Sequence, residues 1–193
     1  MAPAGTAAQW TTARGAAKFE STEQAQRLMD TNFLGAVRVN RAVLPHMRRQ
    51  RSGVIMHISS AAAGLVAPSM GHYCASKFAL EALAESYRYE LAAQGIESVI
   101  VEPGPYETPV FGNMVKAADE ARTNTYGAVK DIPAKLEAAL SSTAGDPQEV
   151  ADAVLKIIAT PAGEKQLRYL VTSASFGVST KSTRSPTACK PTH

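Results

Sequence analysis

The chain has 193 residues, of which 45% are apolar and 19% are charged, and its formal net charge is +3. These values are typical of a single globular domain and exclude a disordered or fibrous chain. Its two cysteines form no disulfide framework, no stretch of about 18 apolar residues predicts a membrane span, and the start lacks the regions of a signal peptide. We therefore expect a cytoplasmic protein.

The first expected element is one long helix. Residues 1–20 are rich in Ala and Thr without a clean period, and we expect an irregular lead there. Ser21 followed by Gln24 has the pattern of a capping box, so a helix is predicted from there to about Arg49. Its apolar residues cover a wide face, as in a helix packed on more than one side. Asn32 lies inside this helix.

Three apolar runs are predicted to be strands, at residues 54–58, 97–102 and 167–171. A helix is expected between the first two, over residues 72–94, with Gly95 as its stop. Asp146 and Pro147 mark the start of another helix that runs to about Ala159. We expect the following residues of that helix to face inward: Val150, Val154, Leu155 and Ile158. Residues 110–132 show few periodic apolar positions, and residues 177–193 are predicted to be a disordered tail.

The helix at residues 72–94 begins with a pair of residues suited to proton transfer. Tyr73 and Lys77 are separated by four positions, so their side chains lie on one helix face. A tyrosine titrates near about 10, and a neighbouring ammonium stabilises its phenolate. We therefore expect Lys77 to lower the pKa of Tyr73 toward the working range.

Two strands are followed by residues that belong at a reaction crevice. The strand at 54–58 ends in Ser59-Ser60, and the strand at 97–102 runs into Pro103-Gly104 and on to Thr108. In open α/β folds the crevice lies at the carboxyl ends of the strands. The sequence therefore predicts that Ser60 and the residues after Pro103 share one edge of a sheet.

Together these motifs resemble the short-chain dehydrogenase/reductase family over roughly residues 20–172. The resemblance implies a catalytic tetrad of Asn32, Ser60, Tyr73 and Lys77. It also implies that the cofactor contacts Tyr73, Lys77 and the segment that contains Pro103, Gly104 and Thr108. In that family the asparagine holds a water at a local kink of its helix and relays protons toward the lysine.

The resemblance implies an NAD(P)-dependent oxidoreductase that transfers hydride between nicotinamide and an apolar alcohol or ketone, and it leaves NAD and NADP open. The small and apolar residues that follow Ser60 form the expected substrate wall. Further candidate substrate contacts are Phe111, Met114 and Tyr126. Helices 23–49 and 72–94 are expected to pair with their copies in a homo-oligomer.

One departure from the family concerns the cofactor. The glycine-rich turn T-G-x-x-x-G-x-G is absent, and the early glycines Gly5 and Gly15 follow no apolar strand. We therefore expect a partial Rossmann-like, doubly wound parallel sheet that lacks the first strands, in an incomplete dinucleotide-binding-type catalytic domain over residues 21–176. An open apolar edge and marginal stability follow. The alternative is a truncated, non-catalytic fragment that acts at most by oligomerising with an intact relative.

Other functions are less consistent with the residues. No G-x-S-x-G turn surrounds Ser60, which argues against a hydrolase. The four histidines show no metal-ligand spacing, so no metal site is expected. The densest basic run, residues 48–51, is explained by a solvated helix end, and no nucleic-acid partner is predicted.

Overall fold

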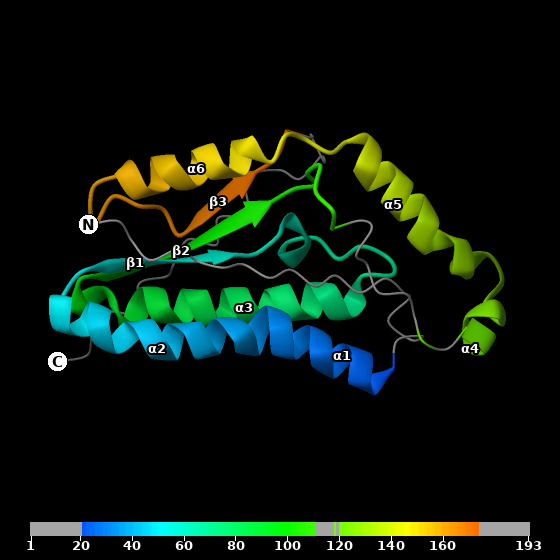
Figure 1. The fold of residues 1–193 in the computed structure, drawn as a ribbon, viewed down its shortest axis with the longest axis horizontal. Helices are drawn as coiled ribbons and strands as arrows, with labels where there is room; N and C mark the ends of the chain where they lie inside the picture. Colours follow the sequence, from blue (N-terminus) through cyan, green and yellow to red (C-terminus); the bar gives the residue numbers. More distant parts are fainter. Residues whose placement is uncertain (1–20, 111–117, 119, 174–193) are drawn as a thin grey trace.

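A parallel sheet forms the centre of the protein, and helices pack on both of its faces (Figure 1). The computed structural model describes residues 21–110, 118 and 120–173. The strands lie in the order β1 (Gly53–Ile58), β2 (Ile96–Pro103) and β3 (Arg168–Val171). One face is covered by α1 (Thr22–Met29), α2 (Gly35–Gln50) and α3 (Gly71–Glu90), and the other by α6 (Gln148–Ala159). The predicted α/β fold with a parallel sheet is confirmed.

The first predicted helix forms, with one irregular turn inside it. The Ser21 hydroxyl accepts the Gln24 N–H at 3.2 Å, and Gln24 Oε1 accepts the Ser21 N–H at 3.0 Å, which completes the capping box. Between α1 and α2 the chain forms a π-helical turn, η1 (Asp30–Leu34). Such turns widen the helix by one residue and occur often at functional sites. Asn32 lies in this turn.

The central strand β2 is buried along most of its length, as strands of a parallel sheet covered on both faces normally are. Toward α2 and α3, Ile55 packs with Leu91 and Ile96 in one apolar cluster. Toward α6, Val99 and Val101 pack with Ile157 in a second cluster. Because each of these fully buried side chains stabilises the fold by about 1.5–3 kcal/mol, the two clusters hold the three layers together.

Helix α6 forms where it was predicted, but the expected inward face is partly wrong. Ile157 is 1% exposed and belongs to the core, whereas Leu155 is 63% and Ile158 is 45% exposed. Val150 packs against the same core cluster as Ile157. Positions 150 and 157 are two helical turns apart, so they face the sheet together, and Leu155 and Ile158 lie off that face.

The predicted helix over 72–94 is divided between α3 and a short 3₁₀ turn, η3 (Ala92–Gln94). Gly95 ends it in the left-handed region, with a φ of 72°. A Cβ at this position would lie 2.2 Å from the Arg51 carbonyl oxygen. Glycine is therefore required both by the backbone angle and by the close approach of the turn before β1.

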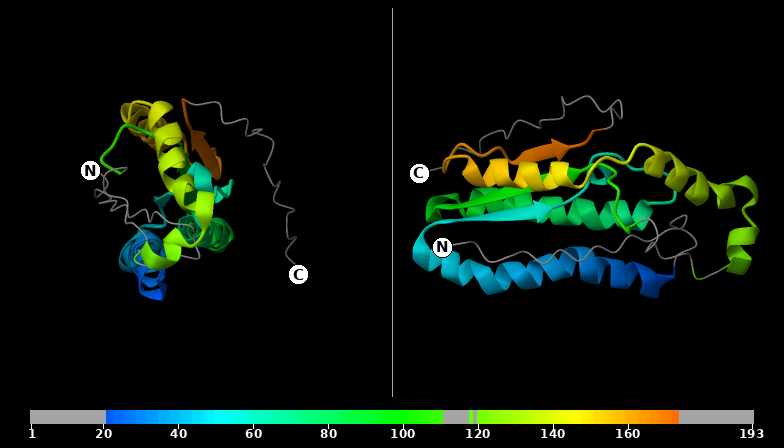
Figure 2. Two further views of the ribbon diagram at one scale, coloured as in Figure 1. Left: turned by 90° about the vertical axis from the view of Figure 1, so that its right-hand side faces the viewer. Right: turned by 45° about the horizontal axis from the view of Figure 1, so that its top comes forward.

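The part of the chain between β2 and α6 is more helical than predicted. It contains α4 (Glu120–Asn124), the 3₁₀ turn η4 (Gly127–Asp131) and α5 (Ile132–Ser142). Figure 2 shows these elements extending beyond the end of the sheet. Pro133 in the first turn of α5 was the available start signal. The predictions for residues 1–20 and 177–193 lie outside the described residues.

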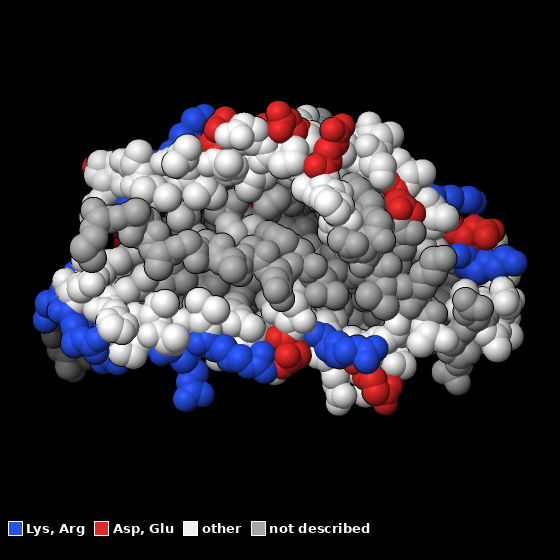
Figure 3. All heavy atoms as spheres, viewed as in Figure 1, with Lys and Arg blue, Asp and Glu red and all other residues white. Residues whose placement is uncertain are grey.

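The surface charge is unevenly distributed. Four arginines of α2 are exposed, namely Arg38, Arg41, Arg48 and Arg49. Figure 3 shows Lys and Arg along the edge of the molecule where α2 lies. No helix among the described residues is long and apolar enough to cross a membrane. Within the described part of the sheet, β1 pairs with β2 alone, so its other edge has no strand beside it there.

Candidate active site

Tyr73 and Lys77 lie on the first two turns of α3, at the carboxyl edge of the sheet. Both side chains are buried, with 7% of Tyr73 and 3% of Lys77 exposed. The Lys77 ammonium lies 5.8 Å from the centre of the Tyr73 ring. It also donates to the Ile58 carbonyl at 3.2 Å, which ties α3 to the last residue of β1. The predicted pair therefore shares one buried site.

The structure distinguishes between the two serines that follow β1. Ser59 is buried, and its N–H donates to the Val101 carbonyl at 2.7 Å, which continues the strand pairing. Ser60 is half-buried and caps the short turn η2 (Ala61–Ala63), where its hydroxyl accepts the Ala62 N–H at 3.2 Å. The Ser60 side chain also acts on Tyr73, where it lowers the pKa of the phenol against the larger effect of burial. Ser60 is therefore the serine that belongs to the site.

Asn32 reaches the same helix through a residue that sequence reasoning missed. Its Nδ2 donates to the Ser76 hydroxyl at 3.1 Å, and that hydroxyl donates to the Tyr73 carbonyl at 2.7 Å. Ser76 is completely buried, and in the sequence it lies between Tyr73 and Lys77. The spacing of Ser76 from Tyr73 was visible in the sequence, but its contact with a residue 44 positions away was not. Ser76 thus attaches the π-helical turn to α3.

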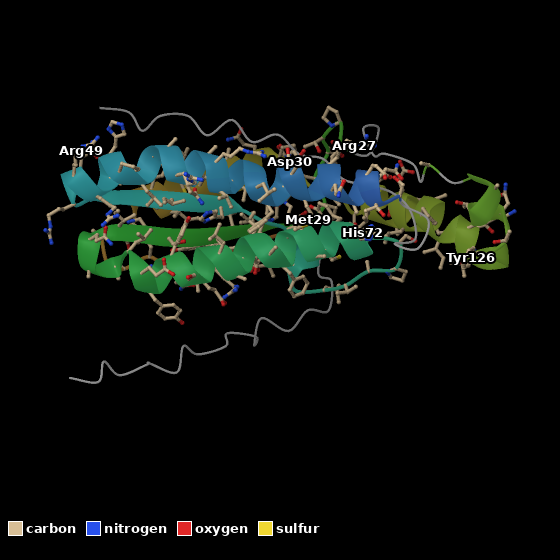
Figure 4. All side chains as sticks on the ribbon, turned by 90° about the horizontal axis from the view of Figure 1, so that it is seen from below. Arg27, Met29, Asp30, Arg49, His72 and Tyr126 are labelled. Atoms are coloured by element: carbon tan, nitrogen blue, oxygen red, sulfur yellow. The ribbon has the colours of Figure 1, made fainter. Side chains whose placement is uncertain are left out.

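An apolar contact closes the site from the side of α1. Leu28 is buried against Tyr73, and Ala62 and Met70 pack on the same cluster. Figure 4 shows α1 and α2 running beside α3, with Met29 at the end of α1 and His72 at the start of α3. The phenol ring is thus enclosed by apolar side chains.

The segment after β2 is positioned by the end of β3. Pro103 is the last residue of β2, and the Gly104 N–H donates to the Val171 carbonyl at 2.8 Å. A Cβ on Gly104 would lie 2.4 Å from the Thr172 hydroxyl, so only glycine allows this approach. Thr108 lies further along and is exposed.

The predicted substrate contacts are only partly placed. Phe111 and Met114 lie outside the described residues. Tyr126 caps η4, and Figure 4 shows it at the far end of the molecule, beyond the start of α3. The loop after Ser60 does present apolar side chains to the surface, since Leu65 and Val66 are exposed.

Burial controls the ionisation of the two central residues. It raises the pKa of Tyr73 above its usual value, and the hydrogen bond from Ser60 opposes this. It lowers the pKa of Lys77 to about 7, and the Glu81 carboxylate opposes that shift. The expectation that Lys77 brings down the pKa of Tyr73 is therefore not met in this structure, because desolvation of the phenol outweighs the other effects.

The donor set at this edge suits the ribose of a nicotinamide cofactor. A buried amine, a phenol and a hydroxyl come together from α3 and the end of β1, and hydroxyl groups of a sugar are natural partners for all three. No strand of the described residues is followed by a glycine-rich turn for a pyrophosphate. These residues therefore fit the nicotinamide end alone. No cluster that could hold a metal ion occurs among the described side chains.

The comparisons with known proteins identify the family of the chain. The family model for short chain dehydrogenase matches residues 3–119. An uncharacterized oxidoreductase of Bacillus subtilis is 34% identical over 153 residues, which are 76% of this chain and 53% of that protein. Retinol dehydrogenase 8 of Bos taurus is 36% identical over 141 residues, which are 69% of this chain and 45% of that protein.

A solved structure shows the same fold. The crystal structure of a short-chain dehydrogenase from Streptomyces avermitilis matches with a TM-score of 0.70 at 29% identity, covering 84% of this chain and 58% of that one. The chain belongs to the short chain dehydrogenase family. It spans about half the length of the curated relatives it matches.

Proposed function

We propose that this protein is an NAD(P)-dependent oxidoreductase that interconverts an apolar alcohol and its ketone or aldehyde. The observation that carries this proposal is the buried arrangement of Tyr73 and Lys77 at the carboxyl edge of the sheet, where Ser60 follows β1. Membership of the short chain dehydrogenase family supports it. The exposed apolar side chains of Leu65 and Val66, on the loop after Ser60, support an apolar substrate.

Each residue has a distinct role in the proposed reaction. The Tyr73 hydroxyl holds the proton that leaves or joins the substrate oxygen, and the Ser60 hydroxyl orients that oxygen. The Lys77 ammonium binds the ribose hydroxyls of the cofactor. The nicotinamide, when bound, supplies or accepts the hydride. Pro103, Gly104 and Thr108 are the proposed contacts for the nicotinamide end.

Asn32 is proposed to complete the tetrad. Asn32 lies in the π-helical turn, and its amide donates a hydrogen bond to Ser76 on α3, the helix that carries Tyr73 and Lys77. A side chain fixed in this way keeps a constant position relative to Lys77, as a proton relay requires.

A homo-oligomer is the proposed assembly. Val39 on α2 is 52% exposed, and Phe78 on α3 is 46% exposed. Apolar side chains on the outer faces of two adjacent helices support pairing with a second copy. Light scattering after gel filtration, with Phe78→Glu as the variant that should become monomeric, tests this assembly.

The proposed function is tested by titrating the folded protein with NADH and with NADPH in a calorimeter. We expect micromolar binding of one of them, followed by oxidation of apolar secondary alcohols with the matching oxidised cofactor. A folded chain that binds neither would contradict the proposal and favour a non-catalytic role. The Lys77→Met variant is the control, because it removes a proposed ribose contact and should bind at least tenfold more weakly.

A further inference from the structure

Glu81 lies one helical turn beyond Lys77 on α3, and both side chains are buried. Glu81 is 7% exposed, which is unusual for a carboxylate without a purpose in folding or function. Residues four apart on a helix face each other, so the carboxylate and the amine belong to the same buried surface. The Tyr73–Lys77 pair therefore continues along α3 as a line of three polar groups.

Arg168 on β3 holds Glu81 in place from the opposite side. Its Nε and Nη2 both lie 3.4 Å from Glu81 Oε2. Arg168 also pairs with Glu85 on α3 and with Glu102 on β2, the latter at 3.2 Å. Glu81 Oε1 is buried and makes no hydrogen bond to any described residue. Oε2 of Glu81 thus binds Arg168, and no hydrogen bond to another described residue holds Oε1.

The charges around this pair favour an interaction with Lys77. The titratable groups nearby are Tyr73 and Glu85 on α3, Glu102 on β2 and Arg168 on β3. The pKa of Lys77 is lowered to about 7 mainly by burial, and the Glu81 carboxylate is the group that opposes this shift. Glu81 also raises the pKa of Glu102, after burial as the main cause. The charge of Glu81 therefore affects the pKa of Lys77 on α3 and that of Glu102 on β2.

We propose that Glu81 is a positioning residue for the active site: Arg168 fixes its carboxylate one turn from Lys77, where its negative charge favours the ammonium form of the lysine over the neutral amine. An uncharged Lys77 has lost one donor for ribose hydroxyls. The catalytic meaning of this inference rests on the proposed function. The charge state of Lys77 can be measured without cofactor or substrate.

The test is the pKa of Lys77 in Glu81→Gln, read from NMR of ¹³C-labelled lysine with the Lys77 signal assigned by its loss in Lys77→Met. We expect Glu81→Gln to lower this pKa by about one pH unit. Glu85→Gln is the matched control, because Glu85 binds the same arginine from the same helix, one turn further from Lys77 and with 39% of its side chain exposed. It should leave the Lys77 pKa unchanged.

The other outcomes decide against the inference. An unchanged pKa in Glu81→Gln, or equal shifts in both variants, would overturn it, because loss of an Arg168 partner alone would then explain the result. If Glu81→Gln does not fold, Glu81→Asp is used instead, because it keeps the charge but moves it away from Lys77. We then expect a smaller decrease in the Lys77 pKa, and no decrease would overturn the inference. A shifted pKa in a protein without dehydrogenase activity would refute the proposed function while leaving the role of Glu81 intact.

Discussion

The two edges of the sheet each bury a lysine, and the surroundings of the two lysines differ. At the amino edge, Lys165 pairs with Glu97 at 2.9 Å and also donates to the Thr160 carbonyl at 2.8 Å. At the carboxyl edge, Lys77 donates to a strand-end carbonyl and lies over the Tyr73 ring, and burial lowers its pKa to about 7. Lys165 is paired with a carboxylate and has a structural role. The charge of Lys77 can change near neutral pH, because desolvation is the dominant effect on it.

The largest expected effect is on catalysis at the carboxyl edge. Tyr73→Phe keeps the buried ring but removes the hydroxyl, so kcat for oxidation of an apolar secondary alcohol should fall about a thousandfold. The unfolding free energy should change by less than about 1 kcal/mol, because the apolar contact with Leu28 remains. Tyr89→Phe is the control, since Tyr89 is exposed on the same helix. Equal activity in both variants would remove Tyr73 from the mechanism.

The amino edge should show the largest loss of stability. Lys165→Met leaves Glu97, whose side chain is 15% exposed, without its ion pair, and urea unfolding should show a loss of about 3 kcal/mol. Lys77→Met should change the unfolding free energy at pH 7 by less than about 1 kcal/mol, because it replaces a desolvated amine with an apolar chain of similar length. If the two variants lose the same stability, the contrast between the two lysines is wrong.

A pH series sharpens the same contrast. The folded pKa of Lys77 is lowered to about 7 from a usual 10.5, so the unfolded chain binds more protons between these values. Stability should therefore rise with pH in this window, by about 2 kcal/mol between pH 7 and 9. Lys77→Met should lack this rise, and parallel profiles for the two proteins would show that Lys77 is not desolvated as described.

The smallest expected effect concerns the contact between the π-helical turn and α3. Ser76→Ala removes the acceptor of Asn32 and the donor to the Tyr73 carbonyl, so we expect a loss of about 1–2 kcal/mol in unfolding free energy. Ser86→Ala on the exposed side of the same helix should lose less than about 0.5 kcal/mol. A loss in Ser76→Ala no greater than in this control would mean that Asn32 is positioned by other contacts.

Local signals predicted most of the elements. The capping residues Ser21 and Gln24, the stop at Gly95 and the start near Asp146 act through neighbouring backbone groups, so their effects can be read from nearby positions. The elements α4 and η4 were missed because residues 110–132 show little apolar period, and α5 was missed because its start was not recognised from Pro133 alone. The exposed Leu155 and Ile158 were misplaced because a wide apolar face does not say which part meets the sheet.

By itself, the sequence determined the order of the strands along the chain and the residues predicted to form the site, because Tyr73 and Lys77 are neighbours on any helix and Ser60 follows an apolar run. Only the tertiary structure decided how these groups ionise and what holds them. Burial raises the pKa of the phenol and lowers that of the amine, Ser76 anchors Asn32, and Arg168 on β3 binds the Glu81 carboxylate on α3. These effects depend on desolvation and on contacts between residues far apart in the chain, which exist only once the layers have packed.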